Sequence, residues 1–463
     1  MYKCIQLKKN KIIYLQIYNF LKVKIETSEL TGKLMPIRKL AKLINVSPST
    51  ISKAYSELEK NGFVIKKEGS GVYINKNQYQ NIFLEDHMES EKFNYGHFNP
   101  EFKIDLSSAT PNETILPIEI LKKSINVILD RDQKNAFLYE DPKGYYFLRK
   151  TICEKLKTDD NISVNIDNLY LVSGAQQGID LFSKSFLSPG DVVVVEYPTY
   201  KGAINTFKKI GCKIISIPIV EDGYSLEKFK NILLKNKVKL FYTMTNFQNP
   251  TGFSMSKEKK LKLLELSNNF NFHILEDDSL SDIYFTKEKP STLKKIDSKN
   301  RVIYIKSYSK IFMPGLKLAC IALTDNIKIL RKFTYKIMHS GLNQRAFQYL
   351  LENNYWDIHM EKARISFKYK QTLMYNSLIK IENIDFYKPK GGLSFWIKLP
   401  ENVSSKAVYL KLLSKGIGIL PGILFSSTLD NYIRISFAQC KNEDIDFSIT
   451  QLNLAIISLI KIS

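Results

Sequence analysis

The sequence predicts two folded parts: a small winged helix-turn-helix domain over residues 1–75 and a large α/β domain with a mainly parallel sheet over residues 104–463. Two patterns lead to this prediction. Three segments with helical apolar spacing and two short apolar runs open the chain, and apolar runs then alternate with helical patterns to its end. The length of 463 residues also exceeds one ordinary domain.

The composition indicates a folded, basic protein. The 68 Lys and Arg and 46 Asp and Glu residues give a formal charge of +22, which attracts nucleic acid or other polyanions. The chain has no run of about 18 apolar residues and no signal-peptide core, so we expect a cytoplasmic protein without a membrane span. The five cysteines lack CxxC spacing, so neither disulfides nor a metal site is expected.

The first 75 residues predict three helices and a β-hairpin. Apolar residues at three- and four-residue steps predict helices over about 14–25 and 37–45. Ser47 provides an N-cap for a third helix, which stops at 61–62. The apolar runs 63–65 and 72–74 flank a basic, glycine-containing tip, which predicts a hairpin wing.

The third helix is the predicted recognition helix. Ser49, Thr50 and Lys53 face outward at its start, where small polar and basic groups can meet phosphates and base edges in a major groove. Residues 1–75 carry 14 Lys and Arg against 5 Asp and Glu, so positive charge is concentrated where DNA contact is expected. The alternative is a small helical domain with an ordinary solvated basic face.

Beyond residues 76–103, a polar and aperiodic stretch expected to be a linker, seven apolar runs alternate with helical patterns. The runs are 169–172, 192–195, 214–219, 240–243, 272–275, 302–305 and 318–323. The alternation predicts a mainly parallel sheet. Ligands of such sheets bind beyond the carboxyl ends of the strands, so the residues after each run are the candidates for a site.

Lys310 is the central candidate. It follows the sixth run, with Ser307 and Ser309 before it and Lys317 seven residues later. A lysine in this place suits an aldehyde cofactor that carries a phosphate, because its amine can form a Schiff base while the hydroxyls and the second lysine hold the phosphate. The alternative is a basic surface loop in a lysine-rich chain.

Residues after four other runs fit the same ligand. A helix that begins at 173–176 would direct N–H groups at an anion, although a simple strand-to-helix turn has the same pattern. Tyr200 offers an aromatic face or is a core tyrosine, and Asn249 lies in an Asn-Pro turn. Asp277, in the acidic stretch 276–278, is costly at a buried strand end unless a cation such as a ring nitrogen pairs with it.

Part of the N-terminal segment resembles the DNA-binding domain of GntR-type bacterial regulators. The pattern is visible in residues 37–41, in 45–47 and in the run 53–73, while Met35 and Pro36 stand where the family usually has Pro and Ser. The resemblance implies five DNA-binding positions: Arg38, Ser49, Thr50, Lys53 and, in the wing, Gly71.

The large domain resembles fold-type I aminotransferases, and the whole chain resembles MocR-subfamily regulators of the GntR type. Supporting motifs are 139–144 with Leu148 and Arg149, and the 249–252 turn. The resemblance implies pyridoxal 5′-phosphate (PLP) as cofactor, with Lys310 forming the internal aldimine and Asp277 pairing with the ring nitrogen. The other implied positions are Tyr200 on the ring, Asn249 at the phenolic oxygen, Ala175, Gln176, Ser307, Ser309 and Lys317 at the phosphate, and Arg434 at a substrate carboxylate.

Two positions depart from the aminotransferase pattern. Lys317 replaces an arginine, and so a point charge stands where the family has a planar fork. Ser279 and Leu280 stand where a tyrosine usually helps Asn249 to hold the phenolic oxygen. The departures bear on turnover more than on cofactor binding.

The sequence therefore predicts a regulator of transcription that senses an amine, an amino acid or PLP itself through aldimine chemistry at Lys310, which changes how the winged helices meet operator DNA. The resemblance implies a homodimer. The alternative is a PLP-dependent aminotransferase with an attached DNA-binding module, in which Lys310 shuttles a proton. The sequence leaves open whether the chain is an enzyme.

Overall fold

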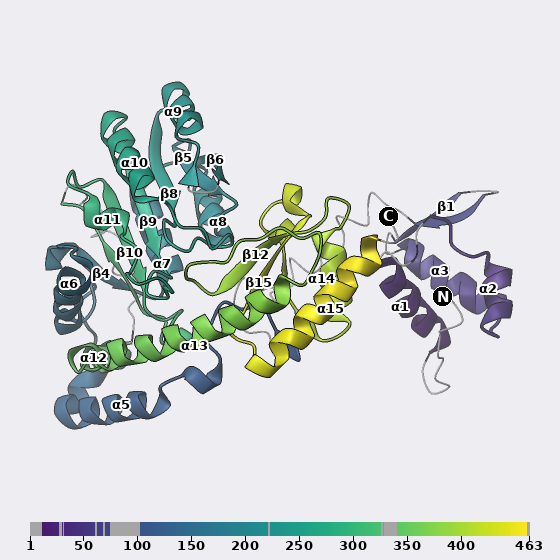
Figure 1. The fold of residues 1–463 in the computed structure, drawn as a ribbon, viewed down its shortest axis with the longest axis horizontal. Helices are drawn as coiled ribbons and strands as arrows, with labels where there is room; N and C mark the ends of the chain where they lie inside the picture. The colour runs from purple at the N-terminus through teal and green to yellow at the C-terminus, as the bar shows by residue number, and fades with distance from the viewer. Residues whose placement is uncertain are drawn as a thin grey trace.

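The computed structural model describes residues 12–26, 30, 32–60, 63–67, 70–74, 102–220, 223–325, 327 and 340–460. Its N-terminal part comprises α1 (Ile13–Glu26), α2 (Ile37–Leu43), α3 (Pro48–Lys60), β1 (Val64–Lys67) and β2 (Gly71–Ile74). The two strands pair antiparallel as a wing (Figure 1). Apolar residues of the three helices and the wing form one core, which includes Leu21, Leu40, Ile51, Leu58 and Val64.

The third helix begins as the sequence predicts. The Thr50 N–H donates to Ser47 Oγ at 3.2 Å, so Ser47 caps α3. The wing differs from the prediction, because Lys66 and Lys67 belong to β1 and pair with Val72 and Gly71 and do not lie in the tip. The longer pairing satisfies further backbone groups. The predicted stop at 61–62 and the predicted linker up to residue 101 lie outside the described residues.

An eight-stranded sheet forms the centre of the large part, in the order β4-β11-β10-β9-β8-β5-β6-β7. The strands are β4 (Leu169–Val172), β5 (Val192–Tyr197), β6 (Lys213–Val220), β7 (Gly223–Tyr224), β8 (Val238–Thr243), β9 (His273–Asp278), β10 (Val302–Ser307) and β11 (Ala319–Ala322). The five strands from β10 to β6 are parallel to one another, whereas β11 and β7 run antiparallel to their neighbours. The predicted α/β class with a mainly parallel sheet is confirmed.

Helices cover both faces of this sheet (Figure 1). The face that carries Val193, Leu240 and Ile303 packs on α7 (Ala175–Phe186) and α8 (Lys201–Ile210). The opposite face packs on α9 (Leu226–Lys235), α10 (Lys257–Asn269) and α11 (Leu293–Ile296) and, toward β4, on α6 (Tyr146–Asp160) and α12 (Gly341–Glu352). Helix α5 (Ile118–Asp132) lies against α12.

A smaller sheet completes the fold. It contains β12 (Ser394–Lys398), β15 (Tyr432–Ser436) and β14 (Leu420–Pro421), and β13 (Ile417–Gly418) pairs separately with β3 (Ile104–Asp105). The long helix α13 (Tyr355–Leu378) runs from the large sheet to the small one, beside which α14 (Ser405–Leu413) and α15 (Asn442–Ile460) lie (Figure 1). Within the described part of the chain, no helix is long and apolar enough to cross a membrane.

Candidate cofactor site

A cavity lies at the carboxyl ends of the parallel strands, on the face that packs on α7 and α8. All nine predicted cofactor residues line it: Ala175, Gln176, Tyr200, Asn249, Asp277, Ser307, Ser309, Lys310 and Lys317. Two further lining residues, Thr110 and Met244, were missed by sequence reasoning. Met244 directly follows the fourth predicted strand, so the strand-end rule could have found it, whereas nothing in the sequence near Thr110 signals the site.

One end of the cavity has the groups that bind a phosphate. Gly174 caps α7 with φ 82°, a conformation that glycine adopts readily, and this brings the positive end of α7 and its free N–H groups to the cavity. Ser307, the last residue of β10, and Ser309 line the same cavity. Lys317 is exposed, and its backbone has the left-handed helical conformation with φ 50°. A dianionic group with several acceptor oxygens fits this end.

Asp277 is buried, with 3% of its surface exposed, and both carboxylate oxygens accept hydrogen bonds. Tyr242 OH donates to Oδ2 at 2.9 Å and Ser279 Oγ donates to Oδ1 at 2.6 Å. Burial raises the pKa of Asp277, while the hydrogen bonds from Ser279 and Tyr242 and the charge of Lys310 lower it. A buried carboxylate held in this way favours a cationic partner, and a protonated ring nitrogen is such a partner.

The acidic stretch lies inside β9, although the sequence predicts it just after the strand. Glu276 Oε1 accepts from Thr245 Oγ1 at 2.5 Å and from the Leu293 N–H at 2.7 Å. Asp278 Oδ2 accepts from Ser281 Oγ at 2.7 Å and from Tyr304 OH at 2.5 Å. Because donors from neighbouring elements satisfy these charges, the strand continues through all three acidic residues.

Lys310 lies three residues beyond β10 and lines the cavity. Burial and the charge of Arg434 lower the pKa of Lys310 to about 8, and the charge of Asp277 opposes this effect. An amine with this pKa has a much larger neutral fraction near neutral pH than an ordinary lysine, and the neutral form is the one that attacks an aldehyde.

Tyr200 and Gln176 meet at Gly202. A Cβ at Gly202 would collide with the ring of Tyr200 and with Gln176 Oε1, so glycine allows both side chains to lie against the cavity. Burial raises the pKa of Tyr200 to about 12, so the phenol is neutral and its ring is available for stacking on a planar ligand. The amide Nε2 of Gln176 donates to Asp180 Oδ1 and to Thr206 Oγ1, each at 3.1 Å.

Arg434 lies behind the cavity wall on β15 and is 2% exposed. Its Nη1 donates to Asn249 Oδ1 at 2.7 Å and its Nη2 to the Ser107 carbonyl at 2.5 Å. Its buried Nε has no partner among the described residues. Burial lowers the pKa of Arg434 to about 10, which leaves the guanidinium charged at neutral pH. A buried, charged guanidinium with an unused N–H donor is suited to binding a carboxylate.

The structure separates the two residues that stand at the position of the family's tyrosine. Leu280 is 5% exposed and belongs to the apolar core, whereas Ser279 lines the cavity. The hydroxyl of Ser279 is directed to Asp277 and not to Asn249. The hydrogen-bonding group at this point of the cavity therefore supports the carboxylate.

The predicted DNA-binding residues lie on α2, α3 and the wing. Arg38, Ser49 and Lys53 are exposed, and Thr50 is half-buried with its Oγ1 2.8 Å from Ser47 Oγ. The Nζ of Lys53 lies 4.3 Å from the centre of the Tyr14 ring, which is a cation–π distance. Gly71 has φ 117° at the start of β2, and a Cβ there would lie 2.8 Å from Lys33 Cε.

The two parts of the chain thus define a class of protein: a winged helix-turn-helix domain joined to an α/β domain whose cavity suits a phosphorylated aldehyde. No group of described His, Cys, Asp and Glu residues could hold a metal ion. Residues 103–452 match the family described as "Aminotransferase class I and II", and residues 13–74 match "Bacterial regulatory proteins, gntR family". The chain belongs to the aminotransferase class I and II family and carries a GntR domain, as in MocR-type regulators.

Some relatives match nearly the whole chain, and others match about three quarters of it. An uncharacterized HTH-type transcriptional regulator, YdfD of Bacillus subtilis, is 31% identical and covers 96% of both chains. The regulator NorG of Staphylococcus aureus is 29% identical over 91% of this chain and 98% of its own. Aromatic-amino-acid aminotransferase 1 of Thermococcus litoralis is 29% identical over 75% of this chain and 87% of its own.

Solved structures agree with the fold of the large part. The multiple substrate aminotransferase of Thermococcus profundus has a TM-score of 0.73 at 29% identity and covers 78% of this chain and 93% of its own. The kynurenine aminotransferase of Pyrococcus horikoshii, solved with PMP, has a TM-score of 0.73 at 28% identity and covers 81% and 93%. Family membership implies PLP as the cofactor of this chain, and the phosphate end, Asp277 and Lys310 fit it.

Proposed function

We propose that the protein is a transcriptional regulator that binds operator DNA through its winged helix-turn-helix and senses an amine or amino acid at Lys310 of its PLP-binding domain. The observation that carries this proposal is the joint presence of a GntR domain and a cavity lined by all nine predicted cofactor residues. The regulator relatives that span nearly the whole chain support it. Operator binding would place its action in the cytoplasm.

The residues in and around the cavity would have separate roles in binding the cofactor and the effector. PLP supplies an aldehyde that condenses with amines and a ring that withdraws electrons. The Lys310 amine would hold the aldehyde carbon covalently and be displaced by an effector amine. Asp277 would keep a proton on the ring nitrogen, and Arg434 would hold an effector carboxylate. Release of Lys310 would be the local change that alters the presentation of α3.

The visible spectrum tests this proposal. Wild-type protein given PLP should develop an absorbance band that a Lys310→Ala variant lacks, and one member of an amine and amino-acid panel should shift the band. The same compound should change the affinity for operator DNA. Absence of the Lys310-dependent band in the wild type would overturn the proposal, and PLP-dependent DNA binding without any amine response would identify PLP itself as the signal.

A second candidate function is that of a PLP-dependent aminotransferase with an attached DNA-binding module. The likeness to aminotransferases favours it, as does a cavity lined by Lys310 and Asp277 with Arg434 bonded to Asn249 behind the wall. In this function Lys310 would also move a proton to and from the substrate Cα. Release of keto acid over many turnovers, dependent on Lys310, would support it, and a single half-reaction or none would exclude it.

A homodimer is part of the proposal. An apolar patch lies where η3 (Gln133–Phe137) leads to α6, and exposed fractions there reach 69% for Phe137, 62% for Leu138 and 94% for Tyr139. Apolar surface of this kind is costly in water and is typical of an interface. Light scattering after size exclusion should give twice the chain mass of 53.5 kDa, and substitution of Phe137 and Leu138 by Ser should shift the protein to monomer.

A further inference from the structure

A second cavity lies beside β10, on the face of the sheet opposite to the cofactor cavity. Successive residues of a strand point to opposite faces. Asp277 and Ser307 line the cofactor cavity, whereas Lys306, on the same strand as Ser307, lines the second cavity and lies 4.0 Å from Asp278 Oδ2. None of the described residues lines both cavities.

The second cavity has a volume of about 220 Å³. Because one water occupies about 30 Å³ of liquid, this space suits a molecule of amino-acid size. Its lining contains four cationic side chains, four aspartates and an apolar, largely aromatic remainder. A lining of this kind is too polar for an empty packing defect and too apolar for a simple water channel.

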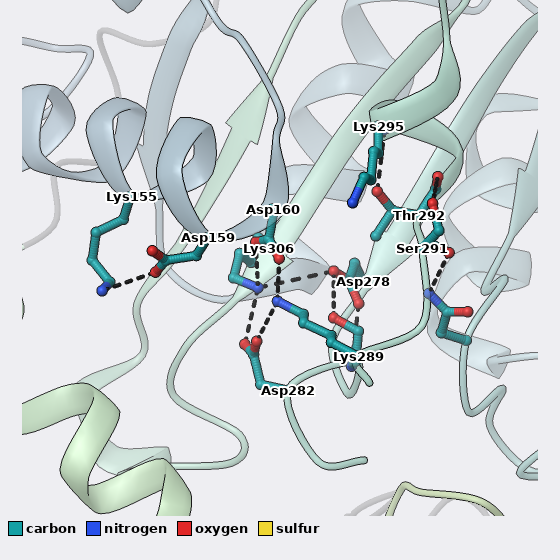
Figure 2. Close-up of polar contacts among 12 residues, drawn as sticks. Lys155, Asp159, Asp160, Asp278, Asp282, Lys289, Ser291, Thr292, Lys295 and Lys306 are labelled. Carbon is teal, nitrogen blue, oxygen red and sulfur yellow. Dashed lines mark hydrogen bonds and ion pairs between the residues drawn. The ribbon is translucent and has the colours of Figure 1, made fainter. Parts of the chain in front are cut away.

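The buried charges beneath the cavity largely neutralise one another (Figure 2). Lys306 is 4% exposed, and its Nζ lies 2.9 Å from Asp282 Oδ2 and 3.7 Å from Asp160 Oδ2. Lys289 also pairs with Asp160 and lies 2.6 Å from Asp282 Oδ1. Burial lowers the pKa of Lys306, but the charges of Asp282 and Asp160 outweigh burial and raise it well above its ordinary value, so Lys306 is charged at neutral pH.

At the cavity rim, Lys155 pairs with the two remaining aspartates. Its Nζ lies 2.9 Å from Asp159 Oδ2 and 2.8 Å from Asp357 Oδ2. The three lysines therefore account for all four aspartates of the lining. The fourth cation, Arg364, is left without a carboxylate among the described residues.

Arg364 lies on α13 and uses little of its hydrogen-bonding capacity. Its Nη1 donates to the Asp282 carbonyl at 3.4 Å, and its guanidinium carbon lies 4.8 Å from the centre of the Tyr284 ring. A guanidinium has five N–H donors in a planar fork that matches a carboxylate. The contact with the face of the Tyr284 ring uses none of these donors.

Aromatic residues form the wall of the cavity. Trp356 and Tyr308 are 5% and 4% exposed and pack edge to face with ring centroids 5.3 Å apart. Met360 adds a flexible apolar side chain beside them. A ligand that reaches Arg364 therefore has an apolar surface next to it.

We propose that this second cavity is a binding site for a small carboxylate with an aromatic or apolar substituent, in which the fork of Arg364 holds the carboxylate and Trp356 and Tyr308 contact the substituent. The site is distinct from the cofactor cavity and independent of the proposed function. A ligand there would lie near Lys306 of β10, the strand that leads to Lys310, and near Asp282, which follows β9.

Tryptophan fluorescence tests the proposal. The chain contains two tryptophans, and a Trp396→Phe variant leaves Trp356 as the single reporter. Trp396 lies in the small sheet, where it stacks on Tyr432 at 5.3 Å. Benzoate and phenylacetate should change the Trp356 emission saturably, whereas benzyl alcohol, which lacks the charge, and benzylamine, which carries the opposite charge, should not. Absence of a saturable response to either carboxylate would overturn the proposal.

Substitutions in the same background identify the group that holds the carboxylate. Arg364→Gln should weaken benzoate binding about tenfold or more, because both the positive charge and the paired hydrogen bonds to the carboxylate are lost. Arg364→Lys should weaken it less, because the charge remains and only the paired geometry is lost. Lys368→Gln, one turn along α13 on the exposed side, should leave it unchanged. Arg434→Gln should also keep the response, because Arg434 belongs to the cofactor site.

Two outcomes would contradict this assignment. Equal benzoate affinity in the Arg364→Gln variant would show that Arg364 does not hold the carboxylate, and loss of the Trp356 response in Arg434→Gln alone would place benzoate in the cofactor cavity. The unfolding midpoint of each variant, measured without ligand, distinguishes lost binding from lost folding. The visible band of bound PLP is recorded in parallel, so failure of this proposal is distinguishable from failure of the cofactor site.

Discussion

Arg434 Nη1 donates a 2.7 Å hydrogen bond to Asn249 Oδ1, which joins the smaller sheet to the turn after β8. Asn249 lines the cofactor cavity, and Arg434 lies directly behind it. The group proposed to hold an effector carboxylate therefore contacts the group proposed to hold the cofactor's phenolic oxygen. Occupation of one position can be transmitted to the other through a single hydrogen bond.

Arg434→Lys should weaken the binding of amino acids about ten- to a hundredfold, because a point charge replaces a planar fork in a buried place. Amines without a carboxylate should bind as before. The measurement is a titration of the visible band of the PLP-loaded protein with an amino acid and with the amine that lacks its carboxylate. An equal loss for both ligands would contradict the role of Arg434.

The reaction of Lys310 with PLP should depend on pH through the lysine amine. Its pKa is lowered from 10.5 to about 8, so the neutral, reactive fraction rises about tenfold per pH unit below 8 and levels off above it. Stopped-flow absorbance of apoprotein mixed with PLP gives the rate, and a small free amine measured in parallel corrects for ionisation of PLP. A rate that keeps rising toward pH 10 would show that Lys310 is not perturbed.

Ser279→Ala should weaken PLP binding about three- to tenfold, because Asp277 loses the donor on Oδ1 and its pKa rises. Tyr242→Phe should have a similar effect through Oδ2. Ser281→Ala is a matched control, since its hydroxyl donates to Asp278 on the other face of the strand. Spectrophotometric titration with PLP measures all three, and an unchanged affinity in both Ser279→Ala and Tyr242→Phe would refute the support of Asp277.

Lys317→Arg should tighten PLP binding several-fold, because a guanidinium can bind phosphate oxygens in a bidentate manner. Lys317 is exposed at the cavity, so the longer side chain meets no core packing. Pyridoxal, which lacks the phosphate, is the control ligand and should bind both proteins equally. A gain shared by pyridoxal would indicate an effect other than phosphate binding.

Arg38→Gln should lower operator affinity, because one phosphate contact is lost. The slope of log K against the logarithm of the salt concentration should become shallower by about 1. Arg38 is exposed on α2. Lys60→Gln, at the opposite end of α3 from Ser49, is the charge-matched control. Fluorescence anisotropy over a range of salt concentrations measures the slopes, and equal slopes for both variants would argue against a contact at Arg38.

Much of the cofactor site was predictable because most of its residues lie at or just after the carboxyl end of a strand. Tyr200, Asn249, Asp277 and Lys310 come from separate segments, yet parallel strands bring their carboxyl ends to one edge. The extent of β9 was not predictable, because three consecutive acidic residues continue a strand only where donors such as Tyr304 and Thr245 reach them.

The sequence alone determined the two-part architecture, the principal strands of the large sheet and most of the residues around Lys310, because apolar periodicity and strand-end position are local properties of the chain. Only the tertiary structure decided that Ser279 and Tyr242 support Asp277 and that Leu280 belongs to the core, since these depend on which side chains meet across strands. It also decided that Arg364, near Trp356, is left without a carboxylate partner among the described residues. Pairing among charges distant in sequence is settled by packing, which no local pattern records.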